Sequence, residues 1–123
     1  MNKLITLIMS LFTLTAISAT DPKTAYSMVQ DNKAVIIDVR EEDEIKSGMI
    51  KDAIWFPMSK VLNDKDWKED FNKIVDRKKI FLHCRTGRRS EKVMKTLKKN
   101  GIESENIGGY EDLKKILPTT EKE

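Results

Sequence analysis

Short apolar runs rich in β-branched residues alternate along the chain with charged stretches whose apolar residues recur at helical spacing. The clearest run, at 34–39, is apolar apart from Asp38, as expected of a strand buried on both faces of a parallel sheet. Strands that alternate with helices predict an α/β fold with a mainly parallel sheet flanked by helices. The other predicted strands are 53–56, 79–83 and 103–107, and the predicted helices are 22–29, 41–46, 61–75, 90–99 and 111–117.

The first 19 residues have the pattern of a secretory signal peptide. Lys3 precedes an apolar or hydroxyl-bearing stretch at 4–17, which is shorter than the roughly 20 residues that span a bilayer. We therefore expect cleavage after Ser18 or Ala19, export to the periplasm and no stable membrane association. The predicted organisation is a signal peptide at 1–19, one domain at 20–118 and a polar tail at 119–123.

The composition argues against several classes of function. The chain has 123 residues, enough for one domain, and its 23 Lys and Arg against 20 Asp and Glu lack the excess typical of a nucleic-acid binder. A single cysteine and a single histidine exclude an internal disulfide and a multi-thiolate zinc site. We expect a monomer with no nucleic-acid partner, no metal and no cofactor.

Cys84 follows the predicted strand 79–83, at the sheet edge where open α/β folds bind ligands. Backbone N–H groups in a tight loop, the start of the next helix and three arginines would all favour an anion there. Such surroundings lower a thiol pKa and keep it reactive, whereas an inert structural cysteine, the alternative, needs none of them. We predict Cys84 as the nucleophile and the following residues as substrate-binding: Arg85, Thr86, Gly87, Arg88, Arg89 and Ser90, the last as helix N-cap.

These residues resemble those of the single-domain rhodaneses, a family of sulfurtransferases. The segment 84–89 is similar to the six-residue rhodanese active loop, with Cys84 matching the cysteine that carries the persulfide. Met49 departs from the histidine usual in the family, and Leu113 stands where tryptophan is common. The resemblance implies a three-layer α/β domain, and with the signal peptide it implies a small periplasmic sulfurtransferase. Three more segments are similar to family motifs: 37–40 followed by Glu44, 48–54 followed by Pro57, and 108–110.

Residues near the loop are predicted to have supporting roles. Adjacent residues of a strand point to opposite faces, so His83 should face away from the thiol. Asp38 and Arg40 should form an ion pair that braces the active loop. The remaining groups are predicted as two core tryptophans, Trp55 and Trp67, and as a solvated helix face that could attract acidic substrates, Lys92, Lys95, Lys98 and Lys99.

The resemblance implies an enzyme that takes the outer sulfur of thiosulfate onto Cys84, releases sulfite and passes the sulfur to cyanide or a thiol. The basic loop favours the thiosulfate dianion over mercaptopyruvate, which carries one permanent charge. A cysteine-based phosphatase or arsenate reductase is disfavoured, because Ser90 stands where those enzymes have arginine and the loop is one residue short. A sulfur carrier or binding module without steady-state turnover stays open as an alternative.

Overall fold

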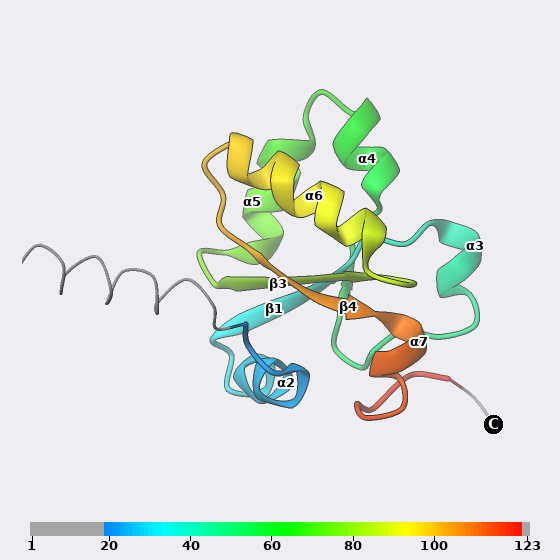
Figure 1. Cartoon of the computed structure of the whole chain (residues 1–123). Helices are drawn as coiled ribbons and strands as arrows, with labels where there is room; N and C mark the ends of the chain where they lie inside the picture. The colour runs from blue at the N-terminus through cyan, green and yellow to red at the C-terminus, as the bar shows by residue number, and fades with distance from the viewer. Residues whose placement is uncertain (1–18, 122–123) are drawn as a thin grey trace, which may run out of the picture.

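The computed structural model describes residues 19–121 and contains a four-stranded parallel sheet with helices on both faces (Figure 1). The strands lie in the order β2-β1-β3-β4, so the two central strands are β1 and β3. Every pairing between neighbouring strands is parallel, which confirms the predicted α/β fold. The strands are β1 (Ala34–Asp38), β2 (Ile54–Trp55), β3 (Lys79–Cys84) and β4 (Glu105–Gly109).

The helices form the outer layers of the domain. One face of the sheet is covered by α4 (Met58–Asn63), α5 (Trp67–Val75) and α6 (Arg88–Lys99), and the other by α2 (Pro22–Gln30) and α7 (Tyr110–Leu113) (Figure 1). A single turn, α3 (Glu42–Ile45), follows β1. No helix among residues 19–121 is long and apolar enough to cross a membrane. The signal peptide predicted at 1–19 lies almost entirely outside the described residues.

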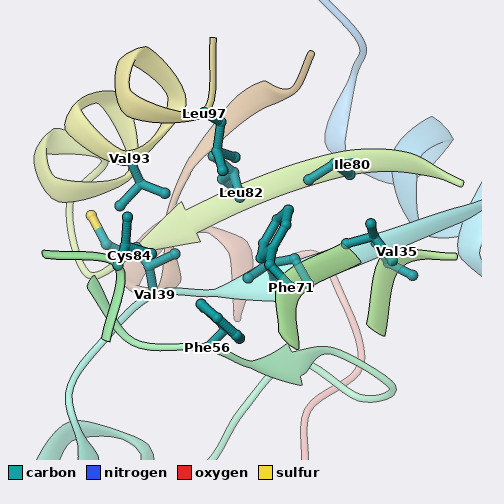
Figure 2. Packing of buried hydrophobic residues seen from close by; sticks show 12 residues of the cluster. Val35, Val39, Phe56, Phe71, Ile80, Leu82, Cys84, Val93 and Leu97 are labelled. Atoms are coloured by element: carbon teal, nitrogen blue, oxygen red, sulfur yellow. The ribbon is translucent and has the colours of Figure 1, made fainter. Parts of the chain in front are cut away.

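The core has two sides because β1 is buried along its whole length. Val35 and Ile37 pack with residues of α5 and α6 in the larger cluster, whereas Ala34 and Ile36 pack against α2. Figure 2 shows the larger cluster, in which Cys84 stands at the end of β3 beside Val93 of α6. The carboxyl ends of the two central strands therefore lie side by side at one end of the sheet, and Cys84 lies there with them.

The predicted single helix at 61–75 is wrong, because two helices, α4 and α5, occupy this region. The chain adopts an extended conformation at Asp64, whose carboxylate accepts the N–H of Asp66 over 2.8 Å. This local hydrogen bond competes with helical bonding, as Asp side chains often do. The apolar residues of 61–75 do lie on helices, as their spacing predicted, but the segment 64–66 divides the region into two helices.

The carboxyl end also differs from the prediction. The helix expected at 111–117 is only the short α7, because the N–H groups of Lys115 and Ile116 donate to carbonyls three residues back and form turns after Leu113. The following residues bind an earlier segment: Lys51 N–H donates to the Pro118 carbonyl over 2.9 Å, and Thr120 N–H donates to the Met49 carbonyl over 2.8 Å. Residues 119–121 of the predicted polar tail are therefore held against the domain.

Candidate active site

The loop after β3 folds around the Cys84 sulfur and leads directly into α6. Gly87 takes a left-handed conformation, with φ of 99°, and its N–H donates to Cys84 Sγ over 3.0 Å. Glycine adopts this conformation without the steric cost that a Cβ imposes. Gly87 is therefore the N-cap of α6, and the prediction of Ser90 as N-cap is wrong: Ser90 lies within the first turn of the helix.

The thiol is buried, with Cys84 only 1% exposed, yet its anion is stabilised. Burial by itself raises the pKa of the Cys84 thiol. Hydrogen bonds from the Ser90 hydroxyl and from the backbone N–H groups of Ser90, Gly87 and Thr86 outweigh burial and hold this pKa below its ordinary value. The dipoles of the loop and of the first helical turn, two of the three causes that the sequence predicted, thus lower the pKa of the thiol.

Asn106 of β4, which the sequence analysis did not identify, forms hydrogen bonds with the residues around the thiol. Its side-chain N–H donates to the Gly87 carbonyl over 2.9 Å, and its Oδ1 accepts the Gly108 N–H over 3.1 Å and the Ser90 hydroxyl over 2.8 Å. The Ser90 oxygen also lies 3.5 Å from Cys84 Sγ. Because a hydroxyl has one proton, Asn106 and the sulfur compete for it.

The end of β4 presses against the loop, and this contact requires glycine. A Cβ placed on Gly109 would lie 2.2 Å from the Arg85 carbonyl oxygen, a distance that no side chain tolerates. The crowding atoms are backbone, so they cannot turn aside as a flexible side chain would. The double glycine of the sequence motif thus lets a neighbouring strand support the loop at close range.

Arg89 connects the loop to α3. Its guanidinium donates two hydrogen bonds to the Glu44 carboxylate, over 2.5 and 2.7 Å. This pairing lowers the pKa of Glu44 to about 2. Arg85 and Arg88, by contrast, are exposed and form no ion pair with any residue between 19 and 121. Of the three arginines predicted to bind an anion, Arg89 is therefore paired with Glu44, whereas Arg85 and Arg88 can still contact a bound anion.

Asp38 and Arg40 form a buried ion pair at the end of β1. Arg40 donates to both Asp38 oxygens, over 2.8 to 3.1 Å, and to the Gly48 carbonyl over 2.8 Å, and its guanidinium lies over the Tyr110 ring. The predicted pair is present, but it ties β1 to the Gly48 segment. The side-chain bridge to the active loop is made by Arg89 and Glu44 instead.

His83 points away from the thiol, as predicted. Its ring stacks on Tyr110, on the face opposite the Cys84 side chain, and its Nδ1 lies 3.0 Å from the Cys84 carbonyl oxygen. Burial lowers the pKa of His83, more than the attraction of Asp38 raises it, so the ring is neutral near pH 7. Its Nε2 finds no hydrogen-bond partner within the described part of the chain.

Trp55 departs from the core position predicted for it. It is 38% exposed, and its indole N–H donates to the Arg40 carbonyl over 2.8 Å. The reason is that β2 is a two-residue edge strand, which buries only part of its side chains. Trp67 packs partly buried against Phe71 in the larger cluster.

The described residues contain no group of three or more acidic, cysteine or histidine side chains placed to hold a metal ion. The site as it stands can supply one thiolate, a set of backbone N–H donors, one hydroxyl and two available guanidinium groups. These are the parts of a nucleophilic site that binds an anion.

The family model described as "Rhodanese-like domain" matches residues 21–115. The chain belongs to this family. Of the curated relatives, "Putative thiosulfate sulfurtransferase, mitochondrial" of Schizosaccharomyces pombe is 37% identical over 87 residues, which are 65% of this chain and 60% of the relative. A tRNA uridine(34) hydroxylase of Bacillus velezensis is 32% identical over 82 residues, which are 67% of this chain but 26% of that protein. The chain thus spans less than two thirds of the first relative's length and about a quarter of the second's.

A solved structure supports the same family. The structure titled "rhodanese with anions from E. coli" is 25% identical, has a TM-score of 0.60 and covers 72% of this chain and 99% of its own. This similarity agrees with the match to the family model.

Proposed function

We propose that this rhodanese-like protein is a sulfurtransferase that moves the outer sulfur of thiosulfate through a persulfide on Cys84 to a thiol or cyanide. The observation that carries the proposal is the enclosure of Cys84 Sγ by the loop, with the Gly87 N–H donating to it over 3.0 Å and a lowered thiol pKa. The name of the yeast relative supports the same donor.

In the first step the Cys84 thiolate attacks the outer sulfur of thiosulfate. A new S–S bond forms, the bond between the two thiosulfate sulfurs breaks, and sulfite leaves with that electron pair. In the second step an acceptor thiolate or cyanide attacks the outer sulfur of the persulfide, and Cys84 leaves as the thiolate. No proton has to be transferred at the sulfur, so the neutral His83, facing away, is not needed as a base.

The protein contributes charge stabilisation to both steps. The loop N–H groups that stabilise the thiolate can also stabilise negative charge on the outer sulfur of the persulfide. Arg85 and Arg88, both exposed and without an acidic partner among residues 19–121, are the groups able to attract the thiosulfate dianion.

The test measures loading and turnover separately. Incubation with thiosulfate alone should add one sulfur atom to the protein by intact mass, and cyanide should remove it as thiocyanate. Cys84→Ser, whose hydroxyl is a far weaker nucleophile, should do neither. Steady-state assays with thiosulfate, mercaptopyruvate and a phosphate ester then identify the donor. Loading without turnover would instead indicate a carrier, and hydrolysis of the ester would contradict sulfur transfer.

Arg88→Ala should lower kcat/KM for thiosulfate by roughly tenfold, because one charge-assisted contact to a bound anion is lost. Mercaptopyruvate, with less charge, should be affected less. Unchanged kinetics in Arg85→Ala, Arg88→Ala and the double variant would contradict a role for these arginines and would mean that the backbone N–H groups alone bind the anion.

We also propose that the protein acts after export to the periplasm, on the strength of the signal-like pattern at 1–19. Intact mass of the protein from its native host should then show a start near Thr20. A retained Met1, with the protein in the membrane fraction, would contradict export.

A further inference from the structure

A groove of about 790 Å³ adjoins the active loop on the side of β4 and α6. Thr86 and Gly87 of the active loop line it, together with Ala19, Thr20, Pro22, Ile107 and Gly108. Gly87 is the residue whose N–H donates to Cys84 Sγ, so the groove reaches the loop that encloses the nucleophile. The proposed sulfur transfer uses Arg88 of this groove but neither Lys92 nor Lys95.

One wall of the groove carries like charges at helical spacing. Arg88, Lys92 and Lys95 line it, and Lys99 continues the same row along α6. All four are exposed, and none forms an ion pair with a residue in the described part of the chain. Like charges three and four residues apart on a helix repel and lower its stability. This arrangement is unfavourable for the isolated domain.

Some surface cations on other elements have acidic partners. Lys60 pairs with Asp70 over 3.0 Å, and Lys114 pairs with Glu111 over 3.7 Å. The one acid in the groove wall, Glu91, accepts a hydrogen bond from Asn106 over 3.3 Å. Among the residues that line the groove, three cations, Arg88, Lys92 and Lys95, therefore stand against one acid, Glu91, and the groove carries net positive charge.

We propose that this groove docks an extended acidic segment of a partner protein against α6. Successive cations in the row are about 4.5–6 Å apart along the helix, and acidic side chains at alternate positions of an extended peptide are about 6.6 Å apart. An acidic segment can thus meet the row residue by residue while its backbone lies in the groove. Docking there brings the partner next to the loop that holds Cys84, and the docking itself does not depend on the sulfur chemistry.

Charge argues against another occupant from this chain. Residues 1–18 contain Lys3 and no acidic residue, so they do not complement the row. A second copy could present the acids of its own 41–44 segment, and the experiment below distinguishes that case.

The experiment measures binding of a dye-labelled peptide with glutamate at alternate positions, Gly-Glu repeated four times, by fluorescence anisotropy at low and at physiological salt. The matched peptide has glutamine in place of glutamate. The key variant is Lys92→Glu with Lys95→Glu, which reverses two charges in the groove. Its control is Lys65→Glu with Lys68→Glu, which makes the same change in charge at two exposed lysines that neither line the groove nor belong to the row on α6.

We expect the glutamate peptide to bind and the glutamine peptide not to, with weaker binding at higher salt. The groove variant should weaken binding roughly tenfold or more, and the control variant less than about threefold. Thermal unfolding checks that both variants fold, and Lys92→Gln with Lys95→Gln replaces the groove variant if it does not.

Equal weakening by the two double variants would show attraction to general positive charge and overturn the groove. Absence of binding to the wild-type protein would overturn the proposal as well. Concentration-dependent dimerisation in sedimentation experiments, abolished by the groove variant alone, would assign the groove to a second copy and not to an acidic partner.

Discussion

The two central strands end in polar clusters that are built on different principles. At the end of β1, Asp38 and Arg40 are buried full charges that neutralise each other through three hydrogen bonds between their side chains. At the end of β3, the buried Cys84 sulfur has no side chain of opposite charge bonded to it among residues 19–121 and is surrounded by backbone N–H groups and one hydroxyl.

The difference separates a structural cluster from a chemical one. A buried ion pair is stable only when each charge keeps its partner, so it holds its surroundings in place and cannot exchange partners. Dipoles stabilise an anion without being consumed by it, so the same N–H groups can serve a thiolate, a persulfide and a departing anion in turn. We expect substitutions at the end of β1 to affect folding most and those at the end of β3 to affect the thiol most.

The largest effect should come from breaking the ion pair on one side. Arg40→Met leaves Asp38 as an uncompensated buried charge and should lower the free energy of unfolding by about 3–5 kcal/mol. Urea denaturation measures the loss. The double variant Arg40→Met with Asp38→Leu should recover part of this loss, because no unpaired charge is left. A double variant as unstable as Arg40→Met would show that Arg40 stabilises the fold by something other than its charge.

The second-largest loss of stability should come from a substitution that crowds the active loop. Gly109→Ala places a Cβ against the Arg85 carbonyl and should lower the free energy of unfolding by about 1–3 kcal/mol while displacing the loop. Slower alkylation of Cys84 at neutral pH would report the displacement. Gly101→Ala is the control, because nothing lies within 4 Å of its added Cβ. Its left-handed backbone should lower stability by only about 1 kcal/mol, and the thiol should be unaffected.

A partly exposed ion pair should have a smaller effect that depends on pH. Glu44→Gln should lower stability by about 1–2 kcal/mol at pH 7, because it removes the charge that pairs with Arg89. The folded-state pKa of Glu44, about 2, is below its ordinary 4.5. The stabilisation is therefore complete above about pH 4.5 and is lost as the pH falls towards 2. Unfolding of the two proteins across this range should show the difference shrinking, and a constant difference would contradict the pairing.

The smallest change in stability, about 1 kcal/mol or less, should accompany the clearest change in the thiol. Ser90→Ala removes a hydroxyl that donates to Sγ and should raise the pKa of Cys84. The pH dependence of iodoacetamide alkylation measures this pKa. Thr96→Ala, which removes a hydroxyl further along α6, should leave it unchanged. An unchanged pKa in Ser90→Ala would mean that the backbone N–H groups suffice.

Local patterns were enough to predict the layers of the fold and the position of the cysteine. The run at 34–39, apolar apart from Asp38, predicted a strand covered on both faces, and the apolar run 79–83 followed by Cys84, glycine and arginines predicted a loop at the carboxyl end of a strand. These inferences rest on residues that are neighbours in the chain, where spacing translates directly into geometry.

The tertiary structure decided which groups meet across the chain. Glu44 and Arg89 are 45 residues apart, and only packing of α3 beside the loop shows that this arginine is occupied and not free for an anion. Asn106 looked like an ordinary strand residue, yet β4 places it against Ser90 and Gly87. Partner choice among many similar charged and polar side chains depends on distances that sequence spacing does not encode. The sequence by itself therefore determined where the thiol is, and the fold decided what stabilises it.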